Sequence, residues 1–352
     1  MLVAALVYGA TPAAAAGPAL RGVQLHSLWY DVSLHNMDRE LDLAAAAGST
    51  VVRVDVVWGS LETTGRGQWE GTYKARLAHF MHGAAARGMK VVATLWSTPC
   101  WASTAPASVK QGCQGAWWNR GVGSYPPAHP RDYARIARWL TSTYGKDLAA
   151  LEIWNEPNNA LPGNSWQTRF KVRDYARLVR AAYPAAKAGN RNVPVIIGAL
   201  SFSDRAWLQR LYAAGLRRYE DGISVHPYNE WRDPTDQWQP QWRKYTFGPG
   251  LDSIHAAMLA AGDTGKVWVT EFGWTIGTGN RWSVTPAEQA LYIGKAFTIL
   301  SGLDYVAEAN VYNLVATSPD PASFEGGFGL LNADYSPRPA YTALMAALKR
   351  QG

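Results

Sequence analysis

Cysteine is nearly absent from this sequence, since Cys100 and Cys113 are the only two among 352 residues. Two thiols without a neighbouring cluster of histidines make a poor metal site, which argues against a structural zinc centre. In an exported protein, such a close pair is expected to form a disulfide that closes a single loop. We therefore predict a Cys100–Cys113 disulfide and no metal.

Charged residues and long apolar runs are also scarce. Charged residues make up 17% of the chain and hydrophobic residues 47%, a balance that leaves material for a core and argues against disorder. The apolar run at residues 2–7 is too short to cross a membrane, and no later run is long enough. The alanines at 13–16 follow it with an Ala-x-Ala cleavage pattern, as in the second half of a secretory signal. We expect residues 1–16 to be a signal remnant and residues 17–352 to form one secreted domain, extracellular or associated with the cell wall.

A dense run of lysine and arginine is missing as well, although the net charge is +7. The arginines are scattered along predicted helices, which favours a solvated basic surface over a nucleic-acid interface. Attraction to an acidic polysaccharide or to a cell wall remains open.

Aromatic residues, in contrast, are abundant, with 17 Trp and 17 Tyr. Flat apolar rings with a polar edge suit sugars, whose C–H faces stack on them, although packing in the core is an equal alternative for any single tryptophan. Many tryptophans lie in segments that follow predicted strands: Trp58, Trp69, Trp101, Trp117, Trp118, Trp166, Trp231, Trp238, Trp242 and Trp282. Long aromatic loops on one face predict a groove for an extended ligand.

Short apolar segments alternate with amphipathic ones along the whole chain. The predicted strands are Gly22–Leu28, Thr50–Val57, Lys90–Leu95, Leu148–Trp154, Val193–Leu200, Gly222–His226, Lys266–Phe272 and Tyr305–Tyr312. The predicted helices are Met37–Ala47, Tyr73–Arg87, Arg131–Tyr144, Arg169–Ala188, Arg205–Ala214, Leu251–Ala261, Pro286–Leu303 and Arg338–Lys349. Eight such units predict a single-domain (β/α)8 TIM barrel, whose site lies in the long loops at the C-terminal face. An open doubly wound sheet would need a glycine-rich first turn, but the first strand ends in His26-Ser27-Leu28-Trp29.

Two glutamates stand where predicted strands end. Glu156 lies in Trp154-Asn155-Glu156-Pro157 after the fourth strand, and Glu271 lies in Thr270-Glu271-Phe272-Gly273-Trp274 on the seventh. In a barrel, both carboxylates can face each other across the mouth. Glycoside hydrolysis needs such a pair, because one group protonates the leaving oxygen while the other attacks the sugar or activates water.

These two motifs resemble those of retaining glycoside hydrolases of clan A, cellulase-like secreted glycosidases, nearest to families 39 and 5. The resemblance covers the whole barrel and extends to four further stretches, Thr98-Pro99-Cys100-Trp101-Ala102, His226-Pro227-Tyr228, Gly329-Leu330-Leu331 and Pro337-Arg338-Pro339-Ala340-Tyr341. It implies that Glu156 is the acid/base, that Glu271 is the nucleophile and that Asn155 binds the sugar 2-hydroxyl. Trp101 and Trp274, which lie within the motifs, are expected to contact substrate.

Polar residues on the neighbouring strands fit the same site. Strand periodicity puts His226 and Tyr228 on one face, and the resemblance aims Tyr228 at Glu271. Arg53 on the second strand must be paired inside a barrel, and pairing with Glu271 would keep the nucleophile ionised. Glu156, in contrast, is expected in a more apolar place, so that it stays protonated near neutral pH.

Other positions leave more than one interpretation open. Clan A enzymes often end the eighth strand with a tryptophan under the sugar, where this chain has Tyr312, so that Tyr312 or another residue is expected to serve as the platform. His26 at the end of the first strand either binds substrate or has a purely structural role. Glu152 and Glu308 are rival acids on strands four and eight, but neither matches a motif.

The leading hypothesis is a secreted retaining glycosidase that cleaves β-linked polysaccharide internally, without a cofactor and as a monomer. An exo-acting β-glycosidase similar to β-xylosidases has the same chemistry. A non-catalytic carbohydrate-binding barrel usually lacks one carboxylate, and both are present here. A metal-dependent barrel hydrolase would need His-x-His at the end of the first strand, which Ser27 and Leu28 do not provide.

Overall fold

The computed structural model describes residues 17–29, 31–111, 113, 121–159, 166–168, 171–237 and 240–350. Its centre is a closed parallel barrel in which each strand pairs with the next and the last pairs with the first. The strands are β1 Leu20–Leu25, β2 Val51–Val57, β3 Lys90–Trp96, β4 Leu148–Ile153, β5 Val195–Ser201, β6 Gly222–His226, β7 Lys266–Phe272 and β8 Val306–Val311. The TIM-barrel prediction is therefore confirmed.

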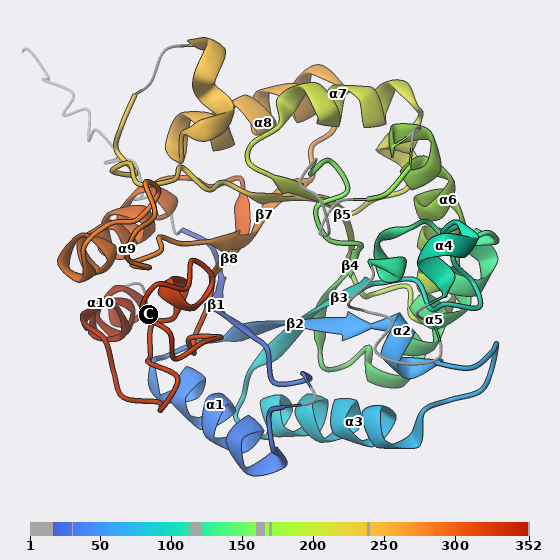
Figure 1. The fold of residues 1–352 in the computed structure, drawn as a ribbon. Helices are drawn as coiled ribbons and strands as arrows, with labels where there is room; N and C mark the ends of the chain where they lie inside the picture. The colour runs from blue at the N-terminus through green and yellow to red at the C-terminus, as the bar shows by residue number, and fades with distance from the viewer. Residues whose placement is uncertain are drawn as a thin grey trace, which may run out of the picture.

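Helices surround this barrel as an outer ring (Figure 1). They are α1 Leu34–Ala46, α2 Trp58–Leu61, α3 Gly71–Ala86, α4 Ala107–Lys110, α5 Pro130–Tyr144, α6 Lys171–Gly189, α7 Arg205–Ala213, α8 Gly248–Ala260, α9 Pro286–Leu300 and α10 Pro339–Lys349. Every residue of β4, β5 and β6 is buried, because the ring covers one face of each strand and the barrel interior fills the other. The apolar strands seen in the sequence follow from this double coverage.

Local chemistry sets the helix ends. Thr285 and Glu288 form a reciprocal capping box at the start of α9, and the Glu70 side chain accepts from the first backbone N–H groups of α3. Gly48 and Gly88 follow α1 and α3 with φ of +92° and +74°, a conformation that glycine adopts without strain. The short helices α2 and α4 were not predicted, because four residues are too few to show a helical period.

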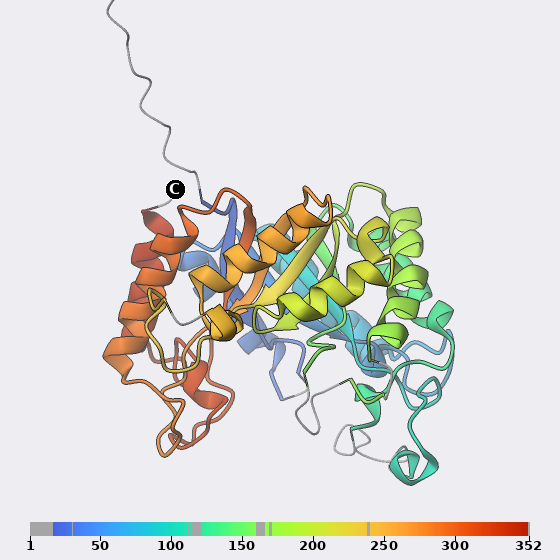
Figure 2. The same cartoon turned by 90° about the horizontal axis from the view of Figure 1, so that it is seen from above.

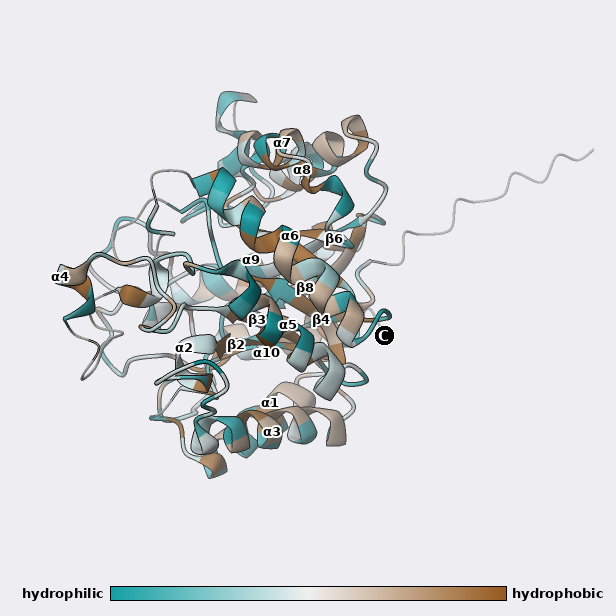
Figure 3. Cartoon of the chain, turned by 90° about the vertical axis from the view of Figure 1, so that its right-hand side faces the viewer, coloured by the Kyte–Doolittle hydropathy of each residue, from teal (hydrophilic) through white to brown (hydrophobic). Residues whose placement is uncertain are grey.

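The loops that follow the strands lie together at one end of the barrel, opposite the C-terminus (Figure 2). In Figure 3 the same loops, with α4 among them, project on the side away from the C-terminus. This is the end at which barrel enzymes carry their active sites.

One of these loops carries the disulfide. Cys100 and Cys113 are joined, with Cα atoms 5.9 Å apart, which confirms the predicted pair. Residues 1–16, the predicted signal remnant, lie outside the described residues. In the part of the chain that the structure describes, no helix has the length and apolar character needed to cross a membrane.

Candidate active site

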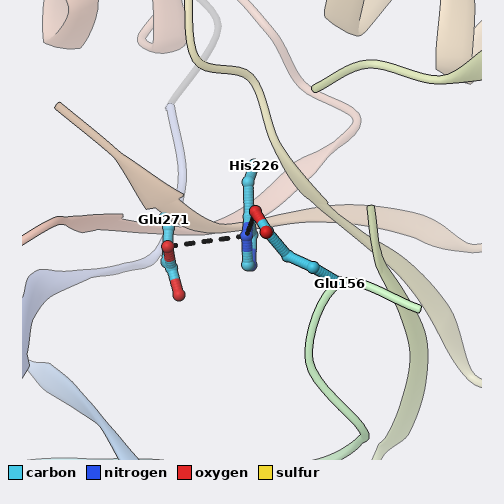
Figure 4. Close-up of side chains that lie close together, drawn as sticks. All are labelled: Glu156, His226 and Glu271. Atoms are coloured by element: carbon cyan, nitrogen blue, oxygen red, sulfur yellow. Dashed lines mark hydrogen bonds and ion pairs between the residues drawn. The ribbon is translucent and has the colours of Figure 1, made fainter. Parts of the chain in front are cut away.

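The two predicted catalytic glutamates come together at the loop end of the barrel. Glu271 is the penultimate residue of β7, and Glu156 lies three residues beyond the end of β4. Figure 4 shows both side chains converging on His226, the last residue of β6, which lies between them. A carboxylate oxygen of each glutamate and a ring nitrogen of His226 lie within 4.8 Å of one another. Residues far apart in the sequence thus form one cluster.

The separation of the carboxylates bears on stereochemistry. Retaining glycosidases hold the two groups about 5–5.5 Å apart, whereas inverting enzymes leave about 6.5–9.5 Å for a water molecule. An oxygen of Glu156 and an oxygen of Glu271 lie within 4.8 Å of each other, which is closer to the retaining separation than to the inverting one. The geometry favours retention of configuration.

Two donors fix the Glu271 carboxylate. Arg53 donates from Nη1 to Oε1, and the Tyr228 hydroxyl donates to Oε2 at 2.8 Å. Each oxygen therefore has a partner, which holds the carboxylate in one orientation. Both contacts were predicted from the sequence, and the geometry brings them together as expected.

Arg53 itself is fully buried and connects four side chains. It donates to Gln24 at 2.9 Å, to Glu152 at 2.9 Å and to Asn155 Oδ1 at 2.8 Å, besides Glu271. Burial alone would lower the pKa of Arg53, but the charges of Glu152 and Glu271 outweigh it and raise the pKa. At 0% exposure, Arg53 acts as a positioning residue for Glu271, the pairing that was expected from the sequence.

Replacing Arg53 by methionine is expected to destabilise the fold by about 3–5 kcal/mol, because it leaves two buried carboxylates without their cation. The loss should be measured by urea denaturation. The double variant with Glu152→Gln should recover part of it, since only Glu271 then lacks a partner. A single variant within about 1 kcal/mol of the parent protein would contradict this role, because that is the range of an exposed pair.

The rival acids have other roles. Glu152 is 0% exposed and accepts from Thr94 at 2.7 Å besides Arg53. Glu308 is also 0% exposed, accepts from Asn310, and has a pKa raised by burial and by the charge of Glu152. Neither carboxylate can reach a sugar in the mouth.

The surroundings of Glu156 correct the sequence prediction. Its carboxylate lies in a polar environment, hydrogen-bonded to His226 Nδ1 at 2.9 Å and to Asn159 Nδ2 at 2.7 Å. Burial raises the pKa of Glu156, but these two contacts outweigh it and the pKa lies below its ordinary value. Among the described residues, no apolar pocket surrounds Glu156 as expected, because the imidazole of His226 points at the carboxylate from β6.

His226 is the complementary half of this pair. Burial lowers the pKa of His226, but the charge of Glu271 and the hydrogen bond that His226 donates to Glu156 raise it above the ordinary value. A raised histidine pKa beside a lowered glutamate pKa means that a proton shared by the two groups favours His226 over Glu156.

Removing His226 should move the basic limb of the pH profile to lower pH. In the parent protein that limb reports loss of the proton shared by His226 and Glu156, which follows the raised pKa of His226. Without His226 the limb reports the Glu156 carboxyl group alone. His226→Phe keeps a ring at this position. The Nε2 atom of His226 has no hydrogen-bond partner among the described residues, so the substitution breaks no bond at that atom.

The comparison variant is His226→Gln, which can still donate a hydrogen bond but carries no charge. The measurement is kcat/KM against pH. The basic limb is expected at the highest pH in the parent protein and at the lowest in the Gln variant, whose amide still stabilises the Glu156 carboxylate, with the Phe variant between them. A limb that stays in place, or moves to higher pH, would show that His226 does not hold the proton used by Glu156.

The backbone beside Glu156 is strained. Trp154 has φ of 69° and Glu156 has φ of 42°, both in the left-handed region that residues with a side chain rarely adopt. The indole of Trp154 is 1% exposed and packs against Trp166 with ring centroids 4.3 Å apart. This packing holds the turn, which aims the carboxylate of Glu156 into the barrel mouth.

Aromatic side chains form one wall of the site. Tyr312, directly after β8, lies with its ring centroid 6.4 Å from that of Tyr228 and 5.5 Å from that of His26. His26 stacks on Trp29 at 4.1 Å, and its Nδ1 lies 3.5 Å from Asp55. Both His26 and Tyr312 thus lie where the sequence placed them, beside the two carboxylates, and their contact with substrate stays a prediction.

The structure corrects the interpretation of Trp274. Its indole is 1% exposed, packs against Phe247 and Phe272, and donates to the Arg232 carbonyl at 3.0 Å. Such a ring cannot stack on a sugar. Trp101 is partly buried, and its N–H is bonded to the Glu62 carbonyl at 2.8 Å, so only its ring remains available.

The other loop tryptophans divide between core and surface. Trp58 and Trp166 are 0% exposed, whereas Trp231 and Trp242 are 40% and 46% exposed. Trp69 and Trp282 are half-buried. Trp117, Trp118 and Trp238 lie outside the described residues. The even split between packing and surface expected from the sequence is compatible with these placements.

Two residues of the site were missed in the sequence. Asn159 lies three positions after Glu156, a spacing that places both on one turn and could have indicated the contact. Glu325 lies in the long loop after β8, where its carboxylate accepts from the Tyr312 hydroxyl at 3.2 Å. No local pattern marks Glu325, because only the fold brings it to the mouth.

The Glu156–His226–Glu271 cluster also has the composition of a metal site. Its charges suit proton transfer better. The guanidinium of Arg53 contacts Glu271 and would repel a cation, and the nitrogen of His226 that faces the cluster is hydrogen-bonded to Glu156. These residues therefore fit an acid/base pair better than a bound ion.

Comparisons with known proteins agree with this geometry. The family model described as Cellulase (glycosyl hydrolase family 5) matches residues 11–317. A search of curated protein sequences finds no significant match.

Many solved structures share the fold. A family 39 glycoside hydrolase from Bacteroides cellulosilyticus WH2 aligns with a TM-score of 0.70 at 23% identity, over 95% of this chain and 64% of its own. An exo-β-1,4-mannosidase from Opitutaceae bacterium strain TAV5 aligns with a TM-score of 0.65 at 18% identity, over 95% and 59%. GH5_18 from Streptomyces cattleya, in complex with Manβ1-4GlcNAc, aligns with a TM-score of 0.69 at 18% identity, over 95% and 80%. This chain thus spans less than two thirds of the first two structures. Families 39 and 5, which the motifs resemble, are both represented.

Proposed function

Because the chain belongs to the cellulase family of glycoside hydrolases, family 5, we propose that it hydrolyses β-glycosidic bonds of a polysaccharide with retention of configuration. The observation that carries this proposal is the pair of carboxylates with oxygens within 4.8 Å of each other. One of them, Glu271, is held by Arg53 and Tyr228, and the other, Glu156, shares a proton with His226. The two carboxylates thus have different partners, a guanidinium and a phenol for Glu271 and an imidazole and an amide for Glu156.

In the first step, Glu271 attacks the anomeric carbon while Glu156 gives a proton to the leaving oxygen. The glycosidic bond breaks, and a covalent glycosyl ester forms on Glu271. In the second step, Glu156 takes a proton from water, which attacks the same carbon and releases the sugar from Glu271. Two inversions give net retention.

Glu156 is ionised in the free protein, so it needs a proton before the first step. We place that proton on the Nδ1 of His226, which lies 2.9 Å from the Glu156 carboxylate. A substrate that displaces water and covers Glu156 disfavours the carboxylate charge, and the proton then passes from His226 to Glu156. The pair thus stores the proton used on the leaving oxygen.

Asn155 positions the sugar in this scheme. Its Oδ1 accepts from Arg53 at 2.8 Å, which leaves the amide N–H groups to donate to the 2-hydroxyl. A contact of this kind strengthens in the transition state. Arg53 therefore orients both the nucleophile and the residue that binds the sugar beside it.

Cleavage within the chain is favoured by the exposed tryptophans Trp231 and Trp242 on the β6–α8 loop, which offer stacking surfaces beyond a single sugar. An exo-acting β-glycosidase is the second candidate, since one structural neighbour is described as an exo-β-1,4-mannosidase and another as a β-xylosidase. The disulfide favours an oxidising compartment and hence secretion.

The test is hydrolysis of a panel of β-linked polysaccharides and aryl β-glycosides by the purified protein. Products are sized, and NMR identifies the anomer that forms first. A β-anomer formed first supports retention, and oligosaccharides of mixed size support internal cleavage, whereas release of single sugars supports the exo-acting candidate. Binding without turnover of any substrate would indicate a carbohydrate-binding barrel and contradict the proposal.

A further inference from the structure

Glu325 is a third carboxylate at the mouth of the barrel that the two-carboxylate mechanism does not use. It lies in the loop between β8 and α10, its side chain is exposed, and the Tyr312 hydroxyl donates to it at 3.2 Å. Tyr312 in turn lies beside Tyr228, whose hydroxyl contacts the nucleophile Glu271. These contacts place Glu325 next to the sugar whose anomeric carbon faces Glu271.

The pKa of Glu325 agrees with this position. Partial burial raises the pKa, and the negative charges of Glu271 and Glu156 raise it further, whereas the Tyr312 hydroxyl and His26 lower it. A carboxylate that interacts with both catalytic glutamates faces the space that the substrate occupies.

The loop holds Glu325 firmly in place. It immediately precedes the short 3-10 helix η5 (Gly326–Phe328), whose carbonyls accept hydrogen bonds from the Arg338 guanidinium and the Gln289 amide. A Cβ on Gly327 would meet Thr275 Oγ1 at 2.0 Å, so the backbone is packed closely against the β7–α9 loop. A residue on such a support keeps its side chain in one region.

The charges around this mouth are unbalanced. Asp55, Glu156, Glu271 and Glu325 present carboxylates, and among the described residues the only lysine or arginine that forms an ion pair with any of them is Arg53. Arg53 is fully buried and is shared with Glu152. The site is therefore locally negative in a protein of net charge +7.

A carboxylate can only accept hydrogen bonds, so it suits a partner that donates. A sugar hydroxyl or ammonium group can donate to Glu325, whereas a sugar carboxylate would face it as a like charge with no donor between them. The basic net charge left an acidic polysaccharide open as substrate, but the local charges at the mouth oppose it.

We propose that Glu325 selects the charge of the sugar bound beside Tyr312, so that the enzyme takes neutral and ammonium-bearing sugars and rejects those that carry a carboxylate. This inference rests on the proposed function, because it concerns the substrate of the same site. Glu325 is a specificity-determining residue and takes no part in the two chemical steps.

The test compares β-linked oligosaccharides that share one backbone and differ in one group. The β-1,4-glucan series offers cello-oligosaccharides, fully deacetylated chitosan oligosaccharides and C6-oxidised cello-oligosaccharides, and glucosides, glucosaminides and glucuronides serve for other linkages. Glu325→Gln keeps the shape and can still accept from Tyr312, but it has no charge. Glu288→Gln, at the exposed N-terminus of α9, is the matched control.

We expect the parent protein to prefer the neutral and ammonium chains. In Glu325→Gln, the ratio of kcat/KM for the carboxylate chain to that for the neutral chain should rise about tenfold or more, because one like-charge contact is removed. The ratio of kcat/KM for the ammonium chain to that for the neutral chain should fall, and kcat/KM for the neutral chain should change little. A residue that only supports the loop would change all three in parallel.

Two results overturn the inference. One is a set of ratios that Glu325→Gln leaves unchanged, and the other is a parent protein that prefers the carboxylate chain. In both cases turnover of the neutral chain would leave the proposed function intact. Neither binding nor hydrolysis of any chain would contradict the proposed function as well.

Discussion

Glu271→Gln should lose activity by a factor on the order of 10⁴–10⁶ in kcat/KM, as expected when a residue that forms the covalent intermediate is removed. The loss should be similar for good and poor leaving groups, because the amide cannot attack the anomeric carbon in either case. The fold should be retained, since the amide oxygen can still accept from Arg53 and the amide NH2 can donate to the Tyr228 hydroxyl, the two groups that donate to the carboxylate now. Circular dichroism and the urea midpoint check this.

Azide distinguishes a nucleophile from other roles of Glu271. In Glu271→Ala, the space that the carboxylate leaves admits azide, which attacks the anomeric carbon directly and gives a glycosyl azide of inverted configuration. Glu288→Gln is the control, since Glu288 is an exposed capping residue of α9, and it should keep full activity. An inverted sugar from the unmodified protein, or an active Glu271→Gln variant, would show that Glu271 is not the nucleophile.

The barrel was predictable because each strand is visible in the sequence as a short apolar segment. Strands β6 and β7 begin and end where the sequence placed them, β6 at His226 and β7 one residue after Glu271. The start of α8 was missed by three residues, because Pro249 stands in the first turn and its glycine neighbours hid the helix. The alternation of strands and helices was sufficient to determine the architecture.

The site was predictable only in part. Glu156 and Glu271 follow strands directly, so the fold alone brings them together. Trp274 lies in the same motif as Glu271, but strand and loop geometry turn its ring into the core. Which way a loop side chain points depends on packing that no short pattern records.

The charge environment was the least predictable part. A general acid was expected in an apolar place, whereas Glu156 is hydrogen-bonded to His226. His226 and Glu325 reach the site from β6 and from the loop after β8, so their effects on Glu156 and on the substrate depend on contacts between distant segments. Electrostatics of this kind are a property of the assembled mouth.

Glu156→Gln is expected to show a loss that depends on the leaving group. For a sugar leaving group, which needs a proton, kcat/KM should fall by about 10²–10⁴-fold. For an aryl group such as dinitrophenolate, which leaves without a proton, the first step should be almost unaffected, and the covalent intermediate should accumulate because no base activates water. The amide can still bond to His226 and Asn159, so the local structure should be retained.

A burst of dinitrophenolate followed by slow turnover would demonstrate this accumulation. Azide, which needs no base, should then restore turnover and give a β-glycosyl azide, the configuration opposite to that from Glu271→Ala. Azide thus distinguishes the two glutamates by the product that it gives. Glu156→Gln leaves the first inversion intact, whereas Glu271→Ala bypasses it. An equal loss on sugar and dinitrophenyl substrates, without a burst, would mean that Glu156 does not supply the proton and that another acid serves in its place.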